Sequence, residues 1–150
     1  MKAILLLSLL GILIFSGCVS ETPTGEVPLG AAPASDQILI PLENVGTEAK
    51  FYEFETGGKT LRFFAVEASD GSIKTAFDAC DVCFSSQKGY RQEGKDLVCN
   101  NCGNKYPIDG LGTKNKAGGG CWPGYLPSKV EGGNLVIEKA DLAAGVSWFS

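Results

Sequence analysis

The chain has 150 residues, with 13 basic and 17 acidic side chains, six cysteines, one methionine and no histidine. The absence of histidine excludes Ser-His and Cys-His nucleophile pairs, histidine-ligated zinc and axial-histidine haem. With a net charge of −4, the chain lacks the basic surface typical of nucleic-acid-binding proteins. Its sequence also contains no phosphate loop or nucleotide fingerprint. The only methionine, Met1, belongs to the leader, so cysteine is the one soft metal ligand that the sequence offers.

Residues 1–17 have the pattern of a lipoprotein signal peptide, with Lys2, an apolar run and small residues directly before Cys18. The apolar run is shorter than the ~20 residues that a membrane-spanning helix needs. Its tail resembles a lipobox, so we expect Cys18 to carry the lipid; an ordinary signal peptide with an incidental cysteine is the alternative. Residues 18–35 then form the lipidated cysteine and a flexible tether, because Pro, Thr, Ala and Gly dominate and bulky apolar residues are almost absent.

Residues 36–150 are expected to form one small, mainly β domain of antiparallel hairpins. Gly57-Gly58 and Asp70-Gly71 mark turns between consecutive strands, and Gly132-Gly133 marks a later one. We also expect a short helix at residues 139–144. The expected strands are residues 38–42, 49–55, 59–68, 72–77, 89–92, 95–99, 128–131 and 135–138.

Two Cys-x-x-Cys pairs, Cys80/Cys83 and Cys99/Cys102, lie fifteen residues apart with a predicted hairpin between them. Two residues between cysteines allow a tight turn to aim both sulfurs at one centre, as in rubredoxin-like and zinc-ribbon-like knuckles. The hairpin would then bring four sulfurs together. Gly103 follows the second pair and permits the positive φ that such a turn often requires.

Several chemistries fit this spacing. Four thiolates suit structural zinc and also iron, as a single ion or a cluster. A redox-active dithiol is a third possibility, although it would prefer a helix start within a βαβ pattern. Disulfide staples are a fourth, because disulfides persist in exported proteins, but five cysteines remain once Cys18 is lipidated.

Cys121 follows three glycines and precedes Trp122. The glycines would let the backbone approach another group closely, so Cys121 is a candidate fifth ligand or reactive thiol; a small buried residue packed near Trp122 is the alternative. Asp78 and Asp81 flank the first pair and could tune a centre, or simply form turns.

This region carries the motifs FDACDVC at residues 77–83, KGYRQ at 88–92, VCNNCG at 98–103, GGCWP at 119–123 and Leu126-Pro127. With these motifs it resembles the FtrD-like membrane iron-sulfur protein family, over roughly residues 36–150. The resemblance implies a membrane protein associated with bacterial iron transport, with metal ligands at Cys80, Cys83, Cys99 and Cys102 and a further candidate at Cys121.

Together these observations predict an exported metal-binding protein, held by its lipid at the outer face of the cell membrane. An iron-sulfur cluster or mononuclear iron would serve electron transfer or iron transport and handling, with redox or iron-transport proteins as partners. A zinc-ribbon-like structural or protein-binding module and a thiol-disulfide oxidoreductase are the alternatives. A metal or electron carrier fits the motifs better than an enzyme does, and no catalytic residue is predicted.

Overall fold

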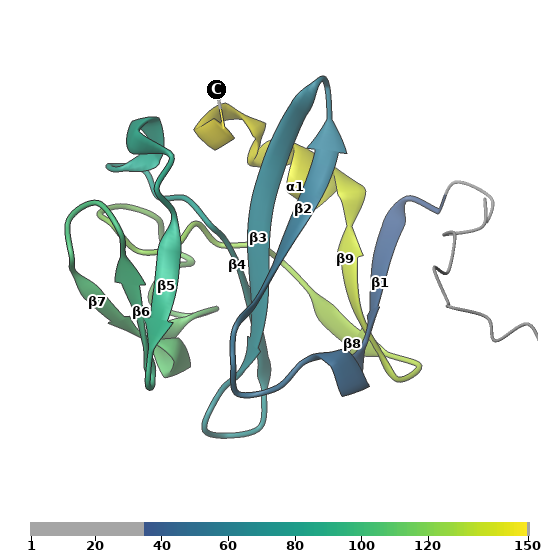
Figure 1. Ribbon diagram of the computed structural model, residues 1–150. Helices are drawn as coiled ribbons and strands as arrows, with labels where there is room; N and C mark the ends of the chain where they lie inside the picture. The colour runs from purple at the N-terminus through teal and green to yellow at the C-terminus, as the bar shows by residue number, and fades with distance from the viewer. Residues whose placement is uncertain (1–34, 150) are drawn as a thin grey trace, which may run out of the picture. The chain divides into compact units, whose positions relative to one another are not determined.

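The computed structural model describes residues 35–149 of the protein. This part of the chain contains nine strands, arranged in three antiparallel sheets of three strands each, and one α-helix (Figure 1). The mainly β fold class is therefore confirmed. The predicted signal peptide, Cys18 and all but the last residue of the predicted tether lie outside the described residues, so their assignments stay predictions.

The three sheets have the strand orders β1-β9-β8, β2-β3-β4 and β5-β6-β7. Four short 3-10 helices lie at Leu42–Asn44, Phe84–Ser86, Ile108–Gly110 and Val146–Phe149. No helix within residues 35–149 has the length and apolar character needed to cross a bilayer. The elements are β1 Gln37–Pro41, β2 Lys50–Thr56, β3 Lys59–Glu67, β4 Ile73–Phe77, β5 Tyr90–Glu93, β6 Asp96–Cys99, β7 Lys105–Pro107, β8 Lys129–Glu131, β9 Asn134–Glu138 and α1 Lys139–Ala144.

The predicted hairpins β2-β3, β3-β4, β5-β6 and β8-β9 all form, and α1 has the predicted bounds. Strand β1 does not pair with β2, its neighbour in the chain, but with β9, from Gln37 opposite Glu138 to Pro41 opposite Asn134. The reason is burial, because Ile38 and Ile40 of β1 pack into the same apolar cluster as Leu135 and Ile137. β7 was not predicted.

Strand β3 lies between two apolar cores, and its successive side chains point alternately into each. Leu61, Phe63 and Ala65 belong to the cluster shared with β9 and α1. Phe64 and Val66 belong to the other cluster, whose buried members include Cys80 and Cys99. The second core therefore supports two of the predicted metal ligands directly.

Leu61→Ala is expected to lower the free energy of unfolding by about 2 to 5 kcal/mol, because Leu61 has no exposed surface and truncation leaves a cavity. Leu39→Ala is the matched control, since Leu39 is 55 % exposed and should change stability by less than about 0.5 kcal/mol. Urea unfolding followed by tryptophan fluorescence measures both. Equal losses in the two variants would contradict this account of the core.

Candidate metal centre

All five cysteines of the described region converge, although they come from three separate loops. Cys80 and Cys83 follow β4, Cys99 and Cys102 lie at the turn between β6 and β7, and Cys121 lies in the loop before β8. Their sulfurs form two groups of three, each with all Sγ atoms within 4.8 Å of one another. One group is Cys80, Cys83 and Cys121, and the other is Cys83, Cys99 and Cys102.

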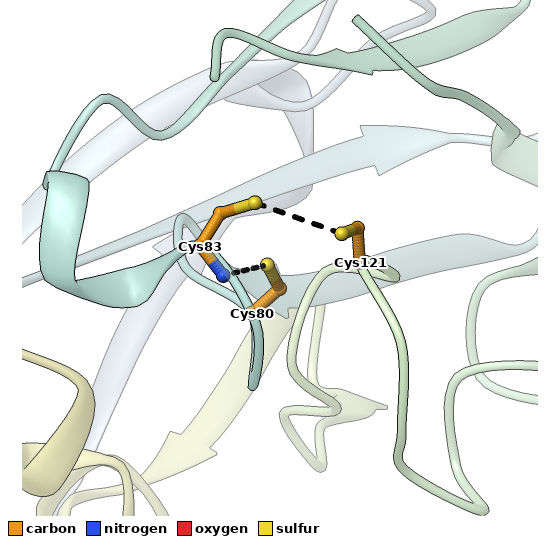
Figure 2. Close-up of side chains that lie close together, drawn as sticks. All are labelled: Cys80, Cys83 and Cys121. Carbon is orange, nitrogen blue, oxygen red and sulfur yellow. Dashed lines mark hydrogen bonds between the residues drawn. The ribbon is translucent and has the colours of Figure 1, made fainter. Parts of the chain in front are cut away.

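The sulfurs of Cys80, Cys83 and Cys121 lie close together (Figure 2), at distances suited to a shared metal. The Sγ atoms of Cys83 and Cys121 are 3.6 Å apart. Two sulfurs on one tetrahedral metal with bonds of ~2.3 Å would lie about 3.8 Å apart. None of the five described cysteines is in a disulfide. The donor set is therefore made of free thiols, the ligands that zinc and iron centres take from cysteine.

The cluster has a covered side and an exposed side. Cys80 and Cys99 are each only 2 % exposed and belong to the apolar core beside β3. Cys83 and Cys121 are half-buried, and Cys102 is exposed. A bound metal would thus be shielded from water by the core and reachable from the side of Cys102.

Backbone pairing beyond the end of β4 places Cys121 beside Cys80. Phe77 N–H donates to Gly124 O at 2.8 Å, and Gly124 N–H donates to Ala79 O at 2.8 Å. The Asp81 carboxylate adds a second connection by accepting a hydrogen bond from Gly119 N–H at 2.9 Å. Residues 77–79 therefore run beside Gly124. Because Cys80 follows Ala79 and Cys121 precedes Gly124, the two thiols lie near one another.

The turn that carries Cys99 and Cys102 is fixed against residues 88–89. Asn100 N–H donates to Gly89 O, and the Asn100 side-chain amide donates to Lys88 O, both at 2.9 Å. Within the turn, Gly103 N–H donates to Cys99 O at 2.8 Å, and the φ of Gly103 is +75°, as the sequence predicted. This geometry holds the second cysteine pair beside the segment that leads into β5.

Asp78 joins these segments through its buried carboxylate. It accepts a hydrogen bond from Tyr90 N–H at 2.6 Å and forms an ion pair with Arg62 at 3.3 Å. Burial raises the pKa of Asp78 to about 6, although the Tyr90 hydrogen bond and the Arg62 charge act in the opposite direction. Asp78 thus serves the site by positioning the chain, and its carboxylate belongs to neither group of candidate metal ligands.

The surroundings shift the pKa values of Cys83, Cys99 and Cys121. A hydrogen bond from the Asn101 side chain is the largest effect on Cys83 and lowers its pKa. Burial raises the pKa of Cys99 to about 11 and that of Cys121 to about 12. A metal ion binds thiolates and displaces their protons, so its charge would offset the cost of burying ionised sulfur at these positions.

The structure brings together every cysteine that the sequence selected, but in a different grouping. The spacing predicted Cys80, Cys83, Cys99 and Cys102 around one centre, whereas Cys80 is grouped with Cys83 and Cys121. Whether the Cys-x-x-Cys turns are metal knuckles stays a prediction, as does the role of each sulfur as a ligand. The sequence analysis missed Asn101, whose position inside the second pair was its only signal.

Gly89→Ala is expected to destabilise the protein more than Gly94→Ala does. Both glycines have similar positive φ values, +63° and +61°, so each substitution should cost roughly 1 to 2 kcal/mol of backbone strain. A methyl group at residue 89 would also overlap the Asp78 carboxylate, while residue 94 has open space around it. This overpacking should lower the free energy of unfolding of Gly89→Ala by a further 1 to 3 kcal/mol, roughly. Urea unfolding of both variants measures the difference. Equal destabilisation would mean that Asp78 does not hold this segment closely.

Comparison with known proteins gives one family. A family model described as "Membrane iron-sulfur containing protein FtrD-like" matches residues 45–149. No curated protein matches the chain. Among solved structures, the quaternary ammonium Rieske monooxygenase CntA, in complex with an inhibitor, gives a TM-score of 0.42 at 11 % identity. That alignment covers 67 % of this chain and 31 % of the monooxygenase. Because the family model matches well over half of its residues, the chain belongs to the FtrD-like family of membrane iron-sulfur containing proteins.

Proposed function

We propose that the five-thiol cluster holds an iron-sulfur or single-iron centre, and that the protein serves electron transfer or iron handling at a membrane. The observation that carries the proposal is the convergence of Cys80, Cys83, Cys99, Cys102 and Cys121 as free thiols on three loops. The family's description favours iron over other metals that thiolates bind. The Cys-x-x-Cys spacing of these thiols is typical of metal sites.

The surroundings of the thiols fit a metal centre that exchanges electrons. Iron held by thiolates supplies one-electron redox chemistry, and hydrogen bonds to the sulfurs and solvent exposure tune its potential. Here Cys83 N–H donates to Cys80 Sγ at 3.2 Å, and the Asn101 side chain donates to Cys83. The buried thiols Cys80 and Cys99 would hold the centre against the core, and the exposed Cys102 would form the edge that a redox partner reaches.

We further propose that a lipid on Cys18 anchors the protein at the outer face of the cell membrane, with residues 18–35 as the tether. Support comes from the lipobox-like sequence before Cys18 and from the family's description as membrane proteins. A tethered domain can approach membrane-bound redox or iron-transport proteins without spanning the bilayer itself. Such proteins are the partners that this arrangement favours.

Structural zinc is the second candidate for the site. The observation that favours it is the membership of Cys80 and Cys99 in the apolar core, because a metal bound there would stabilise the fold directly. In that case the module would bind a partner protein without redox chemistry. The two candidates differ in the metal itself, so one measurement separates them.

Protein purified without oxygen is expected to contain iron and to absorb visible light, because thiolate-bound iron is coloured. Metal analysis and electron paramagnetic resonance of the same sample identify the centre. Cys83→Ser should lose most of the iron, whereas Val82→Ser is the matched control, since Val82 lies in the same turn with its side chain exposed. A colourless protein with stoichiometric zinc would contradict the iron centre and favour structural zinc.

The lipid anchor is tested by labelling cells with radioactive palmitate. Wild-type protein is expected to incorporate the label, and Cys18→Ser should lose it because the acceptor thiol is gone. Cys102→Ser serves as the control, since it removes a thiol elsewhere and should keep the label. Unlabelled wild-type protein in cells whose other lipoproteins are labelled would refute the anchor.

A further inference from the structure

Cys83 is the only one of the five described cysteines that belongs to both sulfur groups. Cys80 and Cys121 lie with it in one group, and Cys99 and Cys102 lie with it in the other. Each group satisfies the same distance limit of 4.8 Å. The five thiols are thus arranged as two triangles that meet at a single sulfur.

This arrangement is not the one that a single four-thiolate ion requires. Four ligands of one tetrahedral ion would all lie about 3.8 Å apart for bonds of ~2.3 Å. Among the described residues, no set of four cysteines satisfies even the limit of 4.8 Å. A single ion bound by one triangle would leave two of the five thiols without a metal.

We propose that the cluster provides two metal positions and that the thiolate of Cys83 bridges them. Cys80 and Cys121 are the other thiolate ligands of the first position, and Cys99 and Cys102 are those of the second. A thiolate sulfur keeps several lone pairs after it binds one metal, so it can bind another. This inference rests on the proposed metal-binding function of the same site, and it adds the number of metals and the role of each sulfur.

The loops support this division of roles. The Cys80–Cys83 turn is attached on one side to the Cys121 loop, through the Asp81 contact with Gly119. On its other side, Asp78 connects it with residues 89–90, which in turn hold the Cys99 turn through Asn100. Cys83 is therefore carried by the middle one of three connected segments, where a shared ligand is needed.

The two positions differ in exposure. The first is formed by buried Cys80 with half-buried Cys83 and Cys121, whereas the second includes the exposed Cys102. A chelator added from solution reaches the second position more easily. The ion bound by Cys99 and Cys102 should therefore leave first, which gives metal removal two phases.

Cobalt(II) is a suitable probe, because it takes the same thiolate ligands and is visible by absorption and by electron paramagnetic resonance. The full chain, reduced and stripped of metal without oxygen, is titrated with cobalt(II) alone. Thiolate-to-cobalt absorption is expected to increase up to two equivalents. The paramagnetic signal should rise with the first equivalent and fall with the second, because two ions that share a sulfur couple antiferromagnetically.

Two results of the wild-type titration would overturn the proposal. Absorption that saturates at one equivalent would leave a single metal position. A paramagnetic signal that doubles with the second equivalent would mean two positions without a shared sulfur. Neither result depends on a variant, so misfolding of a mutant cannot obscure the answer.

Variants assign the sulfurs to their positions. Cys121→Ala and Cys102→Ala should each reduce the coupled pair to one uncoupled cobalt ion, since each removes a ligand of one position only. Cys83→Ala should abolish the magnetic coupling and weaken the binding of both cobalt ions. Unchanged binding of two coupled ions by Cys121→Ala would contradict the assignment of Cys121.

This test is separate from that of the native metal. If the protein is purified with zinc and then binds two coupled cobalt ions, the proposal of native iron is refuted and the proposal of a shared Cys83 sulfur stands. One cobalt ion in a protein that is purified with iron would refute the shared sulfur and keep the iron proposal.

Discussion

The buried carboxylate of Asp78 is the interaction on which the arrangement of the thiols depends. It lies two residues before Cys80, accepts a hydrogen bond from Tyr90 N–H and pairs with Arg62 of β3. A carboxylate buried without partners is costly, so the folded chain keeps Arg62 and the Tyr90 amide in place around it. The Cys80–Cys83 turn, the central sheet and the start of β5 are thereby fixed to one another.

Local patterns in the sequence were sufficient to predict the hairpins and to select the cysteines that the fold brings together. Glycine pairs and alternating apolar residues located β2, β3, β8 and β9, since turns and strand faces are set by near neighbours. The pairing of β1 with β9 could not be predicted in this way, because it depends on burial between distant segments. The strand β7 has one buried residue, Tyr106, and therefore no periodicity to detect.

The same distinction applies to the site. The Cys-x-x-Cys spacing identified four thiols. The glycines before Cys121 made it a fifth candidate, which the family resemblance supported. The division into two groups was not predictable, because it follows from contacts such as those of Gly124 with Phe77 and Ala79, which join segments more than 40 residues apart in the sequence. The function of Asn101 was hidden for a similar reason, since a turn asparagine is common and only the folded turn directs its amide at Cys83.

The site and the core are parts of one structure. Cys80 and Cys99 pack with Phe64 and Val66 of β3, on the opposite side of this strand from Phe63 and Ala65. A metal bound by these thiols would connect loops that the apolar cluster already holds near one another. Metal binding and folding are then coupled, so that occupancy of the centre contributes to the stability of the central sheet.

The pairing of β1 with β9 has a consequence for how the protein is made. Gln37 and Glu138, which meet at one end of this pair, are separated by 101 positions in the chain. Closing so long a loop is slow, and the contact cannot form until β9 has been synthesised. During synthesis β1 therefore has no partner strand until β9 is made, and its sheet is among the last parts of the protein to assemble.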